Sequence, residues 1–148
     1  MSPFETVGGQ TAPAEPPALQ RLRDEAAGYF RAGRFEEAAM LYRRILAASP
    51  KDADSNRRLG VLALGAGRFD EGRRLVEAAL AVNPSDAETW LHHGMALQNL
   101  GQLAEAATSY ERALALRPDY PEALFTLGDV LRGLERSDEA LARFNRFI

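Results

Sequence analysis

The side chains best suited to chemistry in this 148-residue sequence are two adjacent histidines, His92 and His93. Glu88 and His92 stand four residues apart, so on a helix they share one face and could supply two metal ligands. A usable metal site needs a third and usually a fourth ligand, for which Glu122 is conceivable. We expect His92 to be an ordinary residue of a binding surface and predict neither a metal site nor a cofactor.

No catalytic constellation accompanies the histidines. The sequence has no cysteine, which excludes a thiol nucleophile, and it has no phosphate-binding loop, nucleophile elbow or glycine-rich dinucleotide turn. The carboxylate pairs Glu36-Glu37 and Asp138-Glu139 stand at predicted helix starts, where negative charge favours the positive end of the helix dipole. We therefore predict that the chain is not an enzyme.

The composition is that of a soluble globular protein of single-domain size, with 46% apolar and 26% charged residues. The net charge of −3, with acidic residues interspersed throughout, leaves no basic stripe for nucleic acid. No stretch approaches the roughly 20 apolar residues of a membrane span, and the first residues do not resemble a secretory signal. We expect no membrane insertion and a cytoplasmic location. Arginine greatly outnumbers the single lysine, Lys51, which indicates a bacterium with a GC-rich genome.

A 34-residue period organises most of the chain. It relates Gly60, Gly94 and Gly128, and three further series share it. Those series are Gly33, Gly67 and Gly101; Pro50, Pro84 and Pro118; and Ala38, Gly72, Ala106 and Ala140. Residues 1–18, rich in proline, glycine and alanine, bury too little to order themselves and are predicted to be a flexible tail. The predicted repeat domain is 19–148, with repeats at 19–52, 53–86, 87–120 and 121–148, the last one truncated.

Each repeat contains two helical patterns separated by a turn. In the third repeat we predict helices over 87–100 and 103–116, with Gly101 in the left-handed conformation that ends the first. Ser85 and Glu88 form a capping-box pattern at the start of the repeat. Glycine in the middle of a helix costs roughly 1 kcal/mol against alanine. Gly60, Gly94 and Gly128 are therefore expected to admit a closely packed partner helix.

The third repeat carries the family resemblance. Its residues Trp90, Gly94, Leu97, Gly101, Ala106, Tyr110, Ala113 and Pro118 closely resemble the tetratricopeptide repeat consensus. The resemblance implies an all-α, right-handed superhelix (an α-solenoid) of four helix-turn-helix repeats. His93 takes a position that is usually apolar in the family, so a buried, hydrogen-bonded ring is expected there. The fourth repeat departs most, with Glu135 and Ser137 where a glycine and a bulky residue are usual.

The resemblance also implies where a partner would bind, because in this family the first helices line the concave side and receive extended or helical peptides. We expect arginine at one end of this groove, apolar side chains in its middle and acidic groups toward the other end. The predicted groove residues are Arg23, Arg57, Arg58, Val61, Leu64, Leu91, His92, Met95, Phe125 and Asp129. Neither the carboxylate clamp of chaperone-binding members nor the asparagine ladder of members fused to sugar transferases is present.

The sequence is compatible with two functions. The first is a non-enzymatic protein-protein interaction module, a scaffold or adaptor that holds a protein or peptide. The alternative is an N-terminal regulatory or substrate-targeting segment of a larger enzyme such as a transferase. The last predicted helix could also join two copies of the chain in a homo-oligomer. We expect Leu141 and Ile148 to form an exposed self-association edge, while Phe144 and Phe147 face inward.

Overall fold

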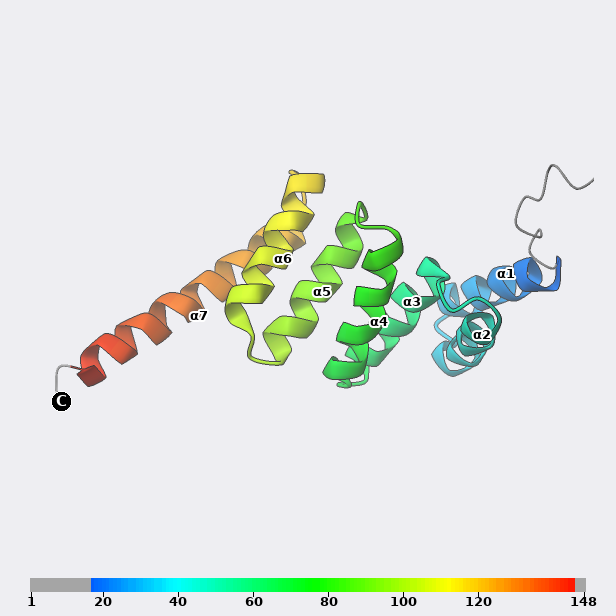
Figure 1. Ribbon diagram of the computed structural model, residues 1–148, viewed down its shortest axis with the longest axis horizontal. Coiled ribbons are helices and arrows are strands. Elements are labelled where there is room, and N and C mark those ends of the chain that lie inside the picture. Colours follow the sequence, from blue (N-terminus) through cyan, green and yellow to red (C-terminus); the bar gives the residue numbers. More distant parts are fainter. Residues whose placement is uncertain (1–16, 146–148) are drawn as a thin grey trace, which may run out of the picture.

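The computed structural model describes residues 17–145, which form seven α-helices joined by short turns. They are α1 (Pro17–Arg31), α2 (Phe35–Ala48), α3 (Ala53–Gly65), α4 (Phe69–Val82), α5 (Ala87–Asn99), α6 (Leu103–Leu116) and α7 (Pro121–Asn145). Each helix packs on the next one along the chain, and together they form an elongated stack with α1 at one end and α7 at the other (Figure 1). The all-α solenoid is confirmed, and the described residues contain no strand.

Glycine makes the turn inside each of the first three repeats. Gly33, Gly67 and Gly101 have φ of 75°, 78° and 80°, a region that a residue with a Cβ atom rarely adopts. Each of these glycines lies between the two helices of its repeat, as the 34-residue period predicts. The sequence therefore identifies the three turns correctly.

The mid-helix glycines allow close packing in repeats two and three but not in repeat four. A Cβ atom on Gly60 would lie 2.7 Å from Val76 Cγ1, and one on Gly94 would lie 2.5 Å from Tyr110 Cε1. Gly128 has nothing within 4 Å of the same position. The prediction of a close approach is thus confirmed at Gly60 and Gly94, and it is wrong at Gly128 because no second helix folds back there.

Aspartates begin two of the first helices. Asp52 accepts a hydrogen bond from the Ser55 backbone N–H at 3.1 Å, and Asp86 accepts one from the Glu88 backbone N–H at 3.2 Å. The predicted capping box at Ser85 is wrong, because Asp86 is the residue whose side chain caps α5. A carboxylate serves this position well, since it both accepts the free amide and favours the positive helix end.

The two ends of the chain differ from the prediction in detail. Helix α1 begins at Pro17, one residue before the predicted end of the tail at residue 18, and proline suits a first helical turn because its missing N–H is not needed there. Residues 1–16 of the predicted tail lie outside the described residues.

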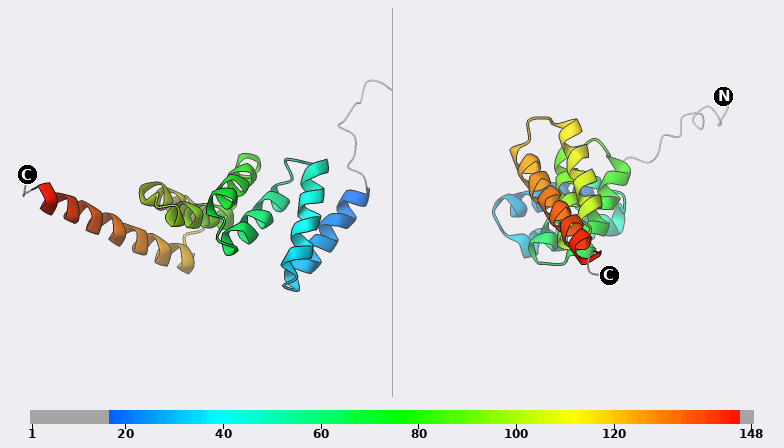
Figure 2. Two further views of the ribbon diagram at one scale, coloured as in Figure 1. Left: turned by 90° about the horizontal axis from the view of Figure 1, so that it is seen from below. Right: turned by 90° about the vertical axis from the view of Figure 1, so that its left-hand side faces the viewer.

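The fourth repeat has no internal turn in the structure. Helix α7 runs without interruption from Pro121 to Asn145, and its C-terminal half extends away from α5 and α6 (Figures 1 and 2). Leu141 is exposed, as expected. The predictions for the side chains of Phe144, Phe147 and Ile148 concern groups that lie outside the described part of the chain.

Among the helices of residues 17–145, none combines the length and apolar character needed to span a lipid bilayer.

Candidate functional site

The first helices of the repeats, α1, α3, α5 and α7, form one continuous surface. Helix α3 contacts α5 and α5 contacts α7, while side-chain contacts join α1 to α3. The second helices α2, α4 and α6 pack behind them, each between two first helices. We call the exposed and half-buried side chains of α1, α3, α5 and α7 the inner surface.

The arginines predicted for this surface are already paired within the chain. Arg23 Nη2 lies 2.8 Å from Asp52 Oδ1, which joins α1 to the cap of α3. Burial alone would raise the pKa of Asp52, but hydrogen bonds from Ser55 and Arg23 hold it below its usual value. Asp52 is therefore charged and has a structural role, and part of the Arg23 guanidinium is already bonded to it.

Arg57 joins the second and third repeats. Its guanidinium lies 2.9 Å from Asp54, 3.8 Å from Asp86 and 3.6 Å from Glu88. Arg57, Asp54 and Asp86 border a small polar cavity of about 290 Å³ between α3, the end of α4 and the start of α5. With three carboxylates around one guanidinium, this part of the inner surface offers an incoming carboxylate little attraction.

Arg58 lies over Phe30, one of the side chains that line an apolar groove near the turn of the first repeat. Its guanidinium carbon lies 4.7 Å from the centre of the Phe30 ring, and its Nε lies 3.1 Å from Asp54 Oδ2. The groove beside it has a volume of about 500 Å³. We call it the Phe30 groove, and it is lined by Phe30, Phe35, Val61, Leu62, Gly65 and Ala66. Val61 was predicted as a binding residue, whereas Phe30, Phe35 and Leu62 were not.

One predicted groove residue, Leu91, lies in the core instead. It is 1% exposed within the cluster built around Tyr110, so its assignment to the groove was wrong. Leu64 is half-buried and occupies the space beside Gly72, since a Cβ atom on that glycine would lie 2.7 Å from Leu64 Cδ2. Gly72, standing in place of alanine, leaves room for this longer side chain, and a role of Leu64 in binding stays a prediction.

His92 and Met95 lie half-buried on α5 between these regions. Met95 packs against the Tyr110 cluster. The Nδ1 atom of His92 is buried without a hydrogen-bond partner in the described part of the chain. Burial lowers the pKa of His92, and the nearby Glu88 opposes that effect only in part. His92 is thus a neutral ring at pH 7.

The neighbouring His93 behaves as predicted for a buried, hydrogen-bonded ring. Its Nε2 lies 3.1 Å from Glu77 Oε1 on α4, and its Nδ1 lies 2.8 Å from Ser109 Oγ on α6. A carboxylate can only accept, so Nε2–H donates to Glu77, and Nδ1 shares a hydrogen bond with the Ser109 hydroxyl. His93 therefore connects three helices and has a structural role.

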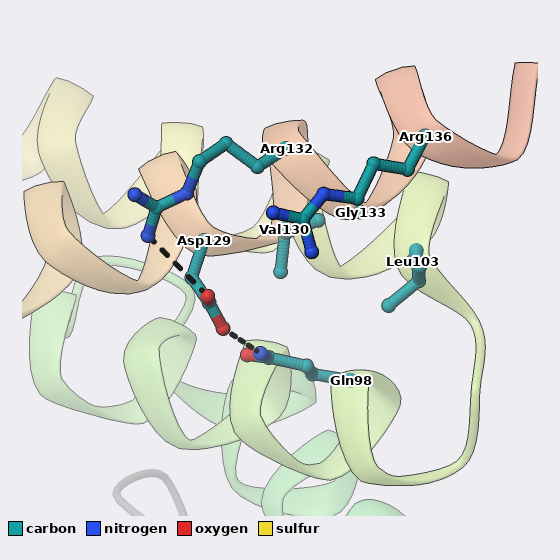
Figure 3. A pocket seen from close by; sticks show the side chains of 7 residues that line it. All are labelled: Gln98, Leu103, Asp129, Val130, Arg132, Gly133 and Arg136. Carbon is teal, nitrogen blue, oxygen red and sulfur yellow. Dashed lines mark hydrogen bonds and ion pairs between the residues drawn. The ribbon is translucent and has the colours of Figure 1, made fainter. Parts of the chain in front are cut away.

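A polar chain links Tyr110 of the core to α7 at the far end of the inner surface, and Figure 3 shows its part from Gln98 through Asp129 to Arg132. Tyr110 O–H donates to Gln98 Oε1 at 2.7 Å, and Gln98 Nε2 donates to Asp129 Oδ2 at 3.1 Å. Arg132 approaches the other oxygen of Asp129 at 3.5 Å. Gln98, Asp129 and Arg132 border a cavity of about 380 Å³ that also reaches Arg136. Asp129 was predicted, but Gln98 was missed because nothing in the repeat spacing marks it.

Phe125 is the most exposed large apolar residue of the inner surface, at 72%. It stands 34 residues after Leu91, and no helix of the described residues follows α7 to cover it. Near it, the residues described by the structure contain no group of three or more histidine, aspartate and glutamate side chains arranged to hold a metal ion.

Comparison with known sequence families identifies the family of this chain. Residues 29–92 match a family described as tetratricopeptide repeat, and residues 94–134 match a second family described as TPR repeat. The chain belongs to the tetratricopeptide repeat (TPR) family. TPR units are in general non-catalytic interaction modules, which agrees with a surface built from helix faces. The comparison with curated proteins finds no significant match.

Solved TPR structures share the fold over most of this chain. The first TPR domain of Spaghetti (RPAP3), bound to the HSP90 peptide SRMEEVD, matches with a TM-score of 0.74 and 26% identity over 79% of this chain and 93% of that domain. A MamA variant matches with a TM-score of 0.72 and 25% identity over 92% of this chain and 78% of MamA. The O-GlcNAc transferase of Thermobaculum terrenum matches with a TM-score of 0.73 and 26% identity over 82% of this chain but only 23% of the transferase.

Proposed function

We propose that this TPR chain is a non-catalytic interaction module that holds an extended or helical segment of a partner protein on its inner surface. The observation that carries the proposal is its likeness to the Spaghetti domain, a domain of the same fold with a peptide bound, of which it covers nearly the whole length. Exposed apolar side chains on the inner surface, such as Phe125, support a protein partner.

The Phe30 groove is the part of the inner surface best suited to an apolar side chain of such a partner. It is open and its lining is mostly apolar, and the Arg58 guanidinium lies over the ring of Phe30, which lines it. Aromatic and aliphatic groups that fill a pocket of this kind contribute most of the affinity in peptide complexes. We propose that the ligand presents an apolar residue to this groove, with an acidic neighbour close to Arg58.

The ligand differs in kind from the HSP90 peptide bound by the Spaghetti domain. The positions that resemble the carboxylate clamp hold Arg23, Ala27, Arg58, Glu88 and His92, so both asparagines are missing. Arg23 and Arg58 are paired with Asp52 and Asp54, and Glu88 repels a terminal carboxylate. We therefore expect SRMEEVD to bind this chain far more weakly than peptides selected for the Phe30 groove.

A selection of displayed random peptides on the immobilised chain tests the proposal. Enriched peptides are then measured by surface plasmon resonance against Val61→Asp, which places a charge in the groove, and against Val82→Asp, which makes the same change at an exposed valine outside it. Circular dichroism verifies that both variants are folded. Loss of binding in Val61→Asp alone supports the proposal. Equal binding by both variants, or no enrichment of any peptide, contradicts it.

A second function rests on the transferase comparison. The chain matches only the repeat part of the T. terrenum enzyme, 23% of its length, so the same fold serves there within a much larger enzyme. A regulatory or substrate-targeting segment of such an enzyme would use the same inner surface. The coding sequence that surrounds this chain in its genome distinguishes the two functions, because only the second requires an adjoining catalytic domain.

A further inference from the structure

The turn residue of the first three repeats is replaced in the fourth. Gly33, Gly67 and Gly101 all have positive φ, and one period after Gly101 stands Glu135. A residue with a Cβ atom is strained in the left-handed conformation that this turn needs, and glutamate is a good helix former. In the earlier repeats the second helix begins with a large apolar residue, Phe35, Phe69 or Leu103. The corresponding position of the fourth repeat holds Ser137. Both changes favour the unbroken helix α7.

An unbroken α7 leaves the face of its N-terminal half without the helix that covers the same face in other repeats. Leu97 on α5 is 2% exposed, whereas Leu131, one period later on α7, is 42% exposed. Leu124, which corresponds to the half-buried Trp90, is exposed as well. Within residues 17–145, the main contacts of α7 are with α6 and α5, and the exposure of Leu124 and Leu131 shows that they leave this face open.

Gly128 marks the centre of the open face. In repeats two and three the corresponding glycines lie against Val76 and Tyr110 of the following helix, so closely that no Cβ atom would fit. Those two side chains stand 16 residues after their glycines. At Gly128 the space is empty, and the residue 16 positions later is Phe144, which lies on the same straight helix and therefore far along its axis.

We propose that the open face of α7 is covered by the C-terminal half of α7 from a second copy of this chain, and reciprocally, so that two α7 helices pack antiparallel in a symmetric dimer. The segment 135–145 carries the repeat register that fits the face at Leu124, Gly128 and Leu131. A straight helix cannot fold back on itself, but a second copy can present the same segment. The exchange places position 144 of one copy over Gly128 of the other, so that the open face of each copy is buried.

The choice of a second copy follows from what the face requires. It needs a helix with a bulky residue opposite Gly128 and a small residue four positions earlier, since Tyr110 is preceded by Ala106 in the third repeat. Phe144 is preceded by Ala140 with the same spacing. The exposed Leu141 lies in this segment too, so burial of both apolar faces favours association.

Sedimentation of the full chain and of two glycine variants gives the first test. Wild type should sediment as a dimer. Glu135→Gly restores the turn residue, so the helix can fold back within one chain and the dimer dissociation constant should rise by roughly tenfold or more. Asp138→Gly weakens the helix as much without supplying the turn at its proper position, and it should remain nearer to wild type. A wild-type monomer at high micromolar concentration, or a dimer that both variants affect equally, overturns the proposal.

Disulfide trapping gives the second test, since the natural chain has no cysteine. A mixture of Gly128→Cys and Phe144→Cys chains should form covalent dimers on mild oxidation, while either variant alone should form few, because like positions lie far apart in an antiparallel pair. The double variant Gly128→Cys/Phe144→Cys provides the opposing outcome. If its disulfide forms within a monomer, the helix folds back in one chain and the exchange does not occur.

Discussion

At the level of single residues, the glycines on first helices are of two kinds, which their surroundings distinguish. The ring of Tyr110 lies where a Cβ atom of Gly94 would be, with three ring atoms at 2.5, 2.6 and 2.9 Å. Gly28 on α1 has nothing within 4 Å of the corresponding point. The same substitution should therefore have opposite effects at the two sites.

We expect Gly94→Ala to lower the free energy of unfolding by about 1–3 kcal/mol, because the buried Tyr110 must move. Gly28→Ala is the matched control and should raise it by about 0.5–1 kcal/mol, through helix propensity alone. Urea unfolding followed by circular dichroism measures both. A stabilised Gly94→Ala variant would show that α5 and α6 are not packed as described.

His92 gives a prediction for pH. Burial lowers its pKa in the folded chain, so the unfolded chain takes up the proton first as the pH falls. The neutral ring thus contributes stability above the unfolded pKa, and this contribution is lost as the pH falls toward the folded pKa. Only two histidines are present, so a proton NMR titration should resolve them, with His92→Gln assigning the signal. A His92 signal that titrates at or above the ordinary histidine value contradicts the described burial.

Tyr110 gives the corresponding prediction at alkaline pH. Burial raises its pKa to about 12. Its protonated form therefore stabilises the fold below the unfolded pKa, and this stability is lost as the pH rises toward 12. An absorbance titration of the wild-type chain follows all four tyrosines. The last of them to ionise should be absent from the same titration of Tyr110→Phe. The same variant removes the donor to Gln98 and should cost about 0.5–1.5 kcal/mol.

At the level of helices, charged side chains connect neighbouring repeats in addition to their packing. Arg57 on α3 reaches two carboxylates at the start of α5, so it joins the second and third repeats. The sequence alone suggested that this arginine was free to bind a partner. Its side chain is instead largely buried among its own carboxylates.

Arg57→Met should therefore reduce stability as well as any binding, by about 1 kcal/mol at low salt and less at high salt. Arg74→Met is the control, because Arg74 on α4 is well exposed and pairs loosely with Asp70 at 3.6 Å. Its effect should be within about 0.5 kcal/mol of zero. Unfolding curves at two salt concentrations give the comparison, and equal effects of the two substitutions would remove the structural role of Arg57.

The helices themselves could be predicted well, and the contacts of their side chains less so. The bounds of α6 agree with the predicted 103–116, because Gly101 and Pro118 delimit it in the sequence. The cap of α5 was misplaced by one residue, since serine and aspartate both suit that position. The burial of Leu91 and the packing of Leu64 against Gly72 depend on which neighbouring side chains leave space, and a repeat period contains no such information.

At the level of the whole molecule, the position of the inner surface could be predicted from the sequence, but the side chains that form its apolar groove could not. The family resemblance placed it on the first helices, and Val61, His92, Met95, Phe125 and Asp129 lie there in varying degrees of exposure. The Phe30 groove was missed, because Phe30 and Phe35 come from one repeat and Val61 and Leu62 from the next. Such a site exists only once two repeats are packed together.

The stack has a mechanical consequence. Every helix contacts its immediate neighbours, and beyond them only α3 with α5 and α5 with α7 share substantial contact. Tension applied between α1 and α7 therefore passes through each interface in series, since among residues 17–145 no substantial contact joins helices at opposite ends of the stack. Pulled in an optical trap, the chain should lengthen like a spring under small forces and then come apart helix by helix from an end, instead of opening in a single step.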